Sequence, residues 1–121
     1  MAHLALSVAI LMIVICTSAA ELPSCQDMTV EVIPCVPYLR DLATNPSSDC
    51  CKGIADLKAM GVTVEDRRAI CKCLQSQAKK VIGLDAGRVA GLPSKCGVDV
   101  PPFSKNTDCN KISAVNIMAR A

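Results

Sequence analysis

Residues 50–73 read CCKGIADLKAMGVTVEDRRAICKC, a stretch that begins with two adjacent cysteines and ends with two cysteines on either side of Lys72. The earlier half predicts a helix over about residues 49–60. This helix is expected to end at Gly61, because glycine is the usual residue just past a helix. Its inward face is expected to carry Cys51, Ile54 and Leu57.

The later half of the stretch predicts a second helix that starts at a capping box. Residues 63–66 read TVED, with Asp66 in the place of the usual Glu. The helix is expected to reach about Lys80, and its inward residues are Ile70, Cys73, Leu74, Ala78 and Val81. Cys71 and Cys73 lie roughly 200° apart around the helix axis, so they must form bonds in different directions.

Before this stretch, the pattern predicts a helix over about residues 26–42. Pro34 and Pro37 lie inside it and are expected to kink it, because proline disrupts the helical hydrogen bonds. The apolar residues that share one face at helical spacing are Val30, Ile33, Tyr38 and Leu42.

After the stretch, a short fourth helix is expected from a cap at Asp85 to Pro93, which should end it. Its inward residues are Val89 and Leu92. From Gly97 onward the chain is expected to be extended, since Pro101 and Pro102 prevent a regular helix. Strand signals are almost absent. The predicted fold is all-α, with four short helices and an extended C-terminal segment.

The composition excludes several classes of function. The chain has 121 residues, enough for one domain, and 13 Lys and Arg against 11 Asp and Glu give a net charge of only +2. A nucleic-acid-binding protein would need a clustered basic face. Tyr38 and Phe103 are the only aromatic residues, too few for a base-stacking platform. No glycine-rich phosphate-binding motif occurs, so we expect no nucleic acid among the partners.

The N-terminus predicts export. Residues 4–16 form an uncharged apolar run, and small residues follow at positions 17–20. This pattern is typical of a secretory signal peptide over residues 1–20, cleaved after Ala20. The alternative is a membrane anchor, which would need about 20 apolar residues and is disfavoured by the short run.

Cleavage would remove Cys16 and His3, leaving eight of the nine cysteines and no histidine. An even number of cysteines in an exported chain indicates disulfide bonds, although up to about 105 pairings remain open. Without histidine, Ser-His-Asp and Cys-His catalysis and the usual zinc sites are excluded. The neighbouring carboxylates Glu65 and Asp66 are explained by a helix N-terminus. We therefore expect no enzymatic activity, no cofactor and no metal.

The spacing of the eight cysteines is C-x9-C-x14-CC-x19-C-x-C-x22-C-x12-C over residues 25–109. This pattern resembles the eight-cysteine motif of plant non-specific lipid transfer proteins, in their type 1 branch. Three local stretches support the resemblance. They are CVPYLR at residues 35–40, TVEDR at residues 63–67 and LPSKCGV at residues 92–98.

The resemblance implies four helices around a hydrophobic tunnel that accepts acyl chains, in a domain over residues 21–109 followed by a flexible tail at 110–121. It also implies the disulfide pairs Cys25–Cys73, Cys35–Cys50, Cys51–Cys96 and Cys71–Cys109. The polar Lys72 between two cysteines fits this type 1 pairing, whereas the type 2 branch usually has an apolar residue there and exchanges the partners.

The resemblance further implies a secreted monomer of the cell wall space that touches membranes transiently. It would carry fatty acids, lysolipids or phospholipids. The expected wall residues are Ile33, Ile54, Leu57, Ile70, Leu74, Val81, Val89, Leu92 and Val100. Arg67, in the family's T-x-x-D-R motif, is expected to meet a carboxylate or phosphate head group, with Asp66, Tyr38 and Phe103 as further candidate contacts.

The chain departs from the family before its last cysteine. The usual P-Y-x-I-S is replaced by PPFSK at residues 101–105, so the tyrosine hydroxyl that can meet the lipid head is lost. Phe103 is expected to cover the opening, and weaker discrimination between head groups is expected.

Two other functions are compatible with an eight-cysteine scaffold. One is an inhibitor of proteases or amylases, for which residues 44–49 form a candidate reactive loop. The other is a seed storage albumin, which is disfavoured because the sequence has only three glutamines. A defensive role through membrane disruption could accompany lipid carriage.

Overall fold

The computed structural model describes residues 21–112, so the expected signal peptide and residues 113–121 of the expected tail lie outside the described residues. Within residues 21–112 the chain is helical and has no strand, which confirms the predicted all-α class. None of the helices in this part of the chain is long and apolar enough to cross a bilayer. The elements in chain order are α2 (Cys25–Val32), η1 (Ile33–Cys35), α3 (Val36–Leu39), α4 (Ser48–Met60), α5 (Val64–Ala78), α6 (Ala86–Lys95) and η2 (Cys109–Lys111).

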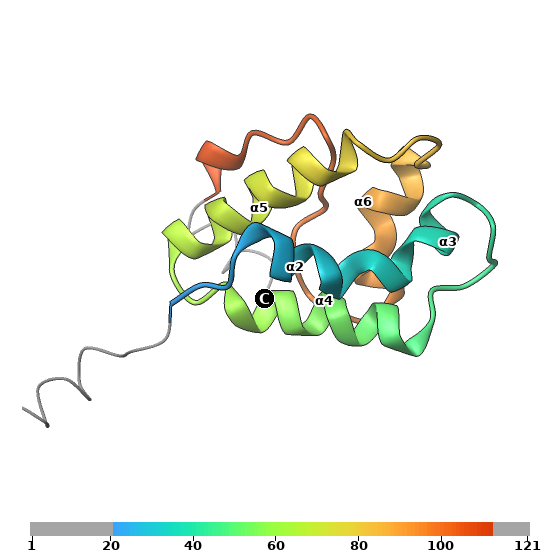
Figure 1. Ribbon diagram of the computed structural model, residues 1–121, viewed down its shortest axis with the longest axis horizontal. Coiled ribbons are helices and arrows are strands. Elements are labelled where there is room, and N and C mark those ends of the chain that lie inside the picture. The colour runs from blue at the N-terminus through green and yellow to red at the C-terminus, as the bar shows by residue number, and fades with distance from the viewer. Residues whose placement is uncertain (1–20, 113–121) are drawn as a thin grey trace, which may run out of the picture.

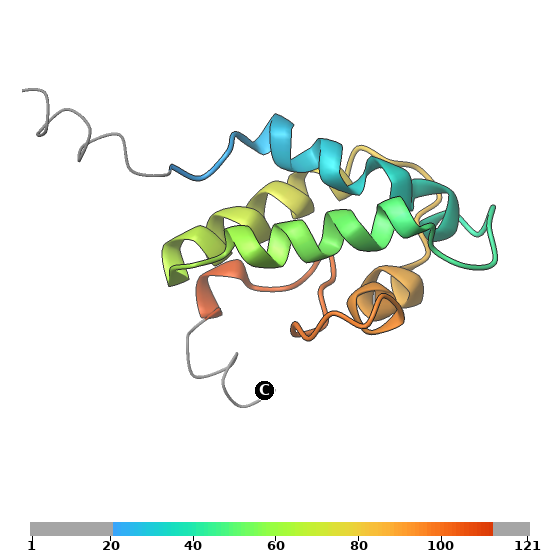
Figure 2. The same cartoon turned by 90° about the horizontal axis from the view of Figure 1, so that it is seen from below.

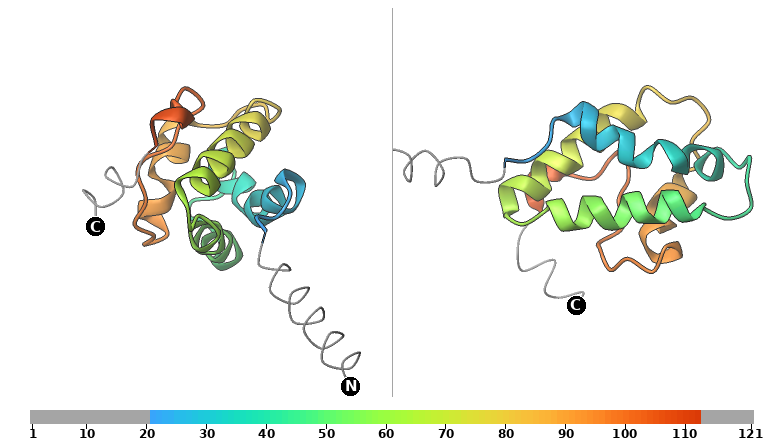
Figure 3. Two further views of the ribbon diagram at one scale, coloured as in Figure 1. Left: turned by 90° about the vertical axis from the view of Figure 1, so that its left-hand side faces the viewer. Right: turned by 60° about the horizontal axis from the view of Figure 1, so that its bottom comes forward.

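The helices surround a common centre. α2 packs against both α4 and α5, and α6 contacts α3 at the far end of the molecule (Figure 1). α4 and α5 lie alongside each other, with α2 on one side of them and the segment after α6 on the other (Figure 2). The end-on view in Figure 3 shows the same order, with the C-terminal segment on the side of α5 opposite α2. Both faces of the α4–α5 pair are therefore covered.

The predicted helix boundaries around residues 50–73 are confirmed. The Thr63 hydroxyl accepts the Asp66 N–H at 3.0 Å, and the Asp66 carboxylate accepts the Thr63 N–H at 3.3 Å, so the capping box is complete. Gly61 caps the end of α4. Asp85 caps α6 by accepting the Arg88 N–H at 2.9 Å.

The apolar face predicted for the first helix is only partly confirmed: Tyr38 packs against the buried cluster of Cys35, Cys50 and Leu92, but the other three residues are largely exposed. Val30 and Ile33 are 57% and 55% exposed, and Leu42 lies beyond α3 and is 71% exposed. Met28 and Cys35 are buried instead. The prolines explain the exposure of Leu42: they break the expected helix into α2, η1 and α3, and the tighter 3-10 turn rotates the residues after it away from the periodic face.

The predicted end of the fourth helix is also wrong. α6 continues through Pro93 to Lys95, because the last turn is closed by other bonds. The Cys96 N–H donates to the Leu92 carbonyl at 3.0 Å, and the Val98 N–H donates to the Pro93 carbonyl at 2.8 Å. α5 ends at Ala78, two residues before the predicted Lys80.

Four disulfides crosslink the elements. They join Cys25 to Cys73, Cys35 to Cys50, Cys51 to Cys96 and Cys71 to Cys109. These are the same four pairs that the resemblance implies. The Cα atoms of each pair are 4.7–5.6 Å apart, within the usual range for disulfides.

The buried core is small and divided. One cluster consists of Met28, Leu57, Ile70 and Cys73, and the other of Cys35, Cys50 and Leu92. Five of the nine buried hydrophobic residues in the described part of the chain are cysteines. Disulfides therefore supply much of the stability that a larger domain would obtain from packed side chains.

Candidate functional site

Two adjoining cavities occupy the centre of the molecule. The first has a volume of about 280 Å³ and lies between α4, α5 and the C-terminal segment. The second, of about 210 Å³, lies between α2, the end of α5 and α6. Both are partly open to solvent. The four residues that line both cavities are Ile54, Leu74, Pro93 and Phe103.

The walls follow from helical periodicity in α4 and α5. In α4, Leu57 and Lys58 lie three and four residues after Ile54, so all three lie on the same side of the helix. α5 continues this pattern into the turn that follows it, with wall residues at positions 67, 70, 71, 74, 77, 78 and 81. The extended residues 99–103 close the remaining side of the first cavity. The arrangement produces a space lined mainly by aliphatic side chains.

The structure brings ten predicted apolar residues to the cavity walls. They are Ile33, Ile54, Leu57, Ile70, Leu74, Val81, Val89, Leu92, Val100 and Phe103. Arg67 also lines the first cavity. Contact between these residues and a lipid stays a prediction.

Two of the candidate lipid contacts lie elsewhere. Asp66 lines neither cavity and serves in the capping box of α5. Tyr38 lines neither cavity and packs against the cluster around Cys35 and Cys50. The Arg88 guanidinium lies 4.6 Å from the centroid of the Tyr38 ring, a cation–π contact that joins α6 to α3.

Arg67, on the wall of the first cavity, is held by backbone carbonyls. Its Nε donates to the Gly61 carbonyl at 2.9 Å, and its Nη2 donates to the Val62 carbonyl at 3.2 Å. Lys58 and Asp99 are the other charged residues on this wall. Among residues 21–112, Lys80 is the only charged residue on the wall of the second cavity. Each cavity is thus apolar inside and carries a cation on its wall.

Several wall residues were not predicted from the sequence. Lys58 lies four residues after Ile54, so helical spacing could have predicted that it lines the same wall. Pro93 was read as the end of a helix, but it lies inside α6 and lines both cavities. Asp99, Pro101 and Pro102 belong to an extended segment, where no periodicity indicates which side faces inward.

The cavity walls offer an apolar surface for binding. Among residues 21–112 no group of three potential metal ligands occurs. Fold and site together define a class: small helical proteins, crosslinked by disulfides, that enclose an apolar cavity open to solvent. Residues 25–109 match the family described as "Protease inhibitor/seed storage/LTP family".

Sequence relatives identify the branch of this family. The chain is 39% identical over 102 residues to non-specific lipid-transfer protein 3 of Hordeum vulgare, covering 84% of this chain and 85% of the relative. It is 44% identical over 96 residues to non-specific lipid-transfer protein 1 of Oryza sativa subsp. indica, covering 78% and 82%.

Solved structures agree with the sequence relatives. One is non-specific lipid transfer protein 1 from barley in complex with a lysophosphatidylcholine, with a TM-score of 0.70, 33% identity and coverage of 75% of this chain and 100% of that one. Another is the wheat protein complexed with two phospholipid molecules, with a TM-score of 0.70, 31% identity and coverage of 74% and 100%. The chain belongs to the non-specific lipid-transfer protein family.

Proposed function

We propose that this chain is a secreted, non-catalytic carrier that binds the acyl chains of fatty acids, lysolipids and phospholipids in its two adjoining cavities. The observation that carries the proposal is the continuous aliphatic lining of a space that is open to solvent. The ligands in related structures support it: a lysophosphatidylcholine in the barley protein, and phospholipid or prostaglandin B2 in the wheat protein.

Burial of the acyl chain provides the affinity. Each buried methylene contributes about 0.8 kcal/mol, so a chain of roughly 16 carbons gains about 12 kcal/mol before ordering costs. A bilayer offers the same chain a comparable gain. Transfer between membrane and protein is therefore close to balanced, which suits a carrier between membranes or toward the cell wall.

Head-group selection is expected to be weak. We assign Arg67, with Lys58 beside it on the wall of the first cavity, to a carboxylate or phosphate head. Phe103 lines both cavities but offers no hydroxyl. Phospholipid and free fatty acid of equal chain length should therefore bind with similar affinity.

The remaining expectations concern the whole chain. We propose that residues 1–20 direct export and are cleaved, that the lipid-transfer domain covers residues 21–109, and that the protein acts as a monomer in the extracellular space. Residues 110–121 are proposed to form a flexible tail. The inhibitor function gains no support from the cavities, because an inhibitor acts through an exposed loop.

Displacement of a fluorescent fatty acid from the oxidised, secreted protein tests the proposal. Saturable binding at one or two sites is expected. Ile54→Trp should weaken binding at least tenfold, because the larger ring would fill the junction of the cavities, whereas the control Val30→Trp changes an exposed residue that lines neither cavity. Absence of lipid uptake together with inhibition of a digestive enzyme would instead support the inhibitor function.

A further inference from the structure

We propose that the protein docks on bilayers containing acidic phospholipids through the surface around the opening of the second cavity. This docking surface consists of Ile33, Arg40, Lys79, Lys80 and Ile82. The inference rests on the proposed carrier function and adds the side from which lipid enters. Lipid would then pass between bilayer and cavity without crossing bulk water.

The apolar part of the docking surface continues from the cavity wall to the outside. Ile33 lines the second cavity and is also 55% exposed. Ile82 is 86% exposed, although its neighbours Val81 and Leu84 line the cavity. Exposing two isoleucines at the rim costs free energy in water, and contact with lipid would recover it.

In the part of the chain that the structure describes, the basic side chains of the docking surface are not neutralised by ion pairs. Within residues 21–112, Arg40, Lys79 and Lys80 form no ion pair, whereas Lys52 on the outer side of α4 is paired with Asp56 at 3.0 Å. That pairing also raises the pKa of Lys52. Arg40 belongs to the same surface because its guanidinium lies beside Gly83 in the turn after α5.

The nearby carboxylates are already engaged. Asp85 caps α6, and Asp41 accepts from the Arg88 guanidinium at 2.7 Å. The backbone fixes the turn beside α3, since the Asp85 N–H donates to the Leu39 carbonyl at 2.8 Å. The opening of the second cavity therefore presents net positive charge on a defined backbone.

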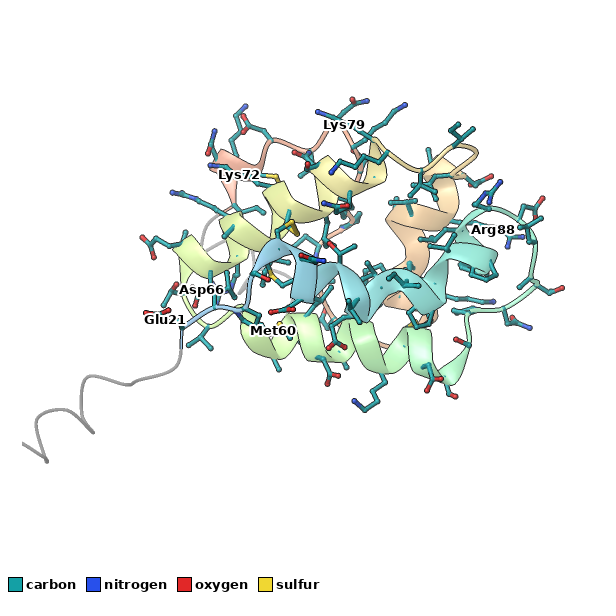
Figure 4. The ribbon with its side chains drawn as sticks, in the orientation of Figure 1. Glu21, Met60, Asp66, Lys72, Lys79 and Arg88 are labelled. Atoms are coloured by element: carbon teal, nitrogen blue, oxygen red, sulfur yellow. A yellow bond between two sulfur atoms is a disulfide. The ribbon has the colours of Figure 1, made fainter. Side chains whose placement is uncertain are left out.

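The opening of the first cavity has a mixed charge. Asp99 lies on its wall with Lys58 and Arg67. The N-terminus of α5 adds further carboxylates, and Figure 4 shows Asp66 and Glu21 together at one end of the molecule, with Lys79 on α5 away from them. Carboxylates offset part of the positive charge of Lys58 and Arg67 there, whereas the second cavity carries Lys80 and, among residues 21–112, no carboxylate on its wall, so charge complementarity favours the second opening.

Vesicle sedimentation with phosphatidylcholine alone and with added phosphatidylglycerol tests the docking surface. The parent protein should bind the mixed vesicles and lose most of this binding at high salt. Lys79→Glu should weaken vesicle affinity about tenfold or more, because it replaces the attraction of a basic residue to the anionic surface by repulsion. Ile82→Ser should weaken it about fivefold by removing an apolar contact.

Matched controls locate the effect. Lys72→Glu makes the same charge change two turns earlier on α5, and Val62→Ser removes another exposed apolar side chain near the first cavity. Both should leave vesicle binding within about twofold of the parent. Equal losses in the controls would overturn the assignment of this surface, and so would a parent protein that ignores phosphatidylglycerol.

Uptake of lipid from solution tests the carrier function independently of docking on a bilayer. Lys79 and Ile82 line neither cavity, so both variants should bind a soluble fluorescent fatty acid as the parent does. Normal uptake with reduced vesicle binding supports the docking surface. Normal uptake with unchanged vesicle binding overturns docking alone, whereas a parent without uptake overturns the carrier function itself.

Discussion

Phe103 replaces the expected tyrosine at a position that lines both cavities, and it is the only phenylalanine in the sequence. A phenyl ring packs against acyl chains as well as a tyrosine ring does, but it donates no hydrogen bond. Polar recognition in the first cavity therefore depends on charged side chains. Of these, Arg67 has the most fixed position, because two backbone carbonyls hold its guanidinium.

Arg67→Gln should lower fatty-acid affinity about fivefold at low salt, because a half-buried cation next to a carboxylate contributes about 1 kcal/mol. The difference should shrink as salt screens the interaction. Fluorescent displacement at two ionic strengths measures both effects.

Two controls identify the charge as the cause of a loss in the Arg67→Gln variant. Lys72→Gln removes one positive charge from the exposed side of the same helix and should not change affinity. A fatty alcohol carries no charge, so its binding should be equal in parent and Arg67→Gln. An unchanged fatty-acid affinity at low salt would contradict the head-group role.

At the level of elements, local rules predicted α4 and α5 well because caps and periodicity act within each helix. The capping box at Thr63 and the glycine at the end of α4 are local signals, and both were confirmed. The buried side of α2 depends instead on the position of Met28 against α4 and α5, which the sequence spacing does not encode. Pro93 was misread because α6 continues past it, with the Cys96 and Val98 N–H groups bonded to the Leu92 and Pro93 carbonyls.

The crossing of α2 and α4 depends on Gly53. A Cβ atom at this position would overlap the backbone carbonyl of Glu31 in α2, and a backbone atom cannot rotate away as a side chain can. The Cys35–Cys50 disulfide also holds η1 to α4, so the helices cannot separate freely. Gly53→Ala should therefore lower the free energy of unfolding by about 3 kcal/mol, measured by guanidinium denaturation.

Gly91 provides the matched control for the crossing. It lies inside α6, and a Cβ atom there would meet no neighbour within 4 Å. Gly91→Ala should stabilise the protein by about 0.5–1 kcal/mol, because alanine restricts the unfolded chain. A similar loss of unfolding free energy in Gly53→Ala and Gly91→Ala would show that the close contact between α2 and α4 does not limit stability.

At the level of the whole molecule, the sequence predicted the helical walls of the site but only two residues, Val100 and Phe103, of the wall contributed by the C-terminal segment. The α5 wall residues follow from a repeat of three and four positions. Contacts further along the chain hold the segment that carries residues 99–103 against α5. Gln75 in α5 donates to the carbonyls of Ser104 and Thr107, and Arg68 donates to the Ile112 carbonyl at 3.0 Å.

The Cys71–Cys109 disulfide is the covalent part of this attachment, and it predicts a separation between stability and binding. It closes a loop with a sequence separation of 38, against 15 for Cys35–Cys50. Loop entropy alone predicts losses of about 4 and about 3 kcal/mol when the pairs are replaced by alanine. Both double variants should thus unfold at lower guanidinium concentration, by similar amounts.

Lipid affinity should distinguish the two double variants under conditions in which both remain folded. Loss of Cys71–Cys109 frees the segment that carries Val100 and Phe103, so fatty-acid affinity should fall about tenfold or more. Neither Cys35 nor Cys50 lines a cavity, so loss of that pair should leave affinity within about twofold of the parent. Equal affinities in the two variants would mean that the C-terminal segment keeps its place through Gln75 and Arg68 alone, and that the shape of the cavity does not depend on its covalent attachment.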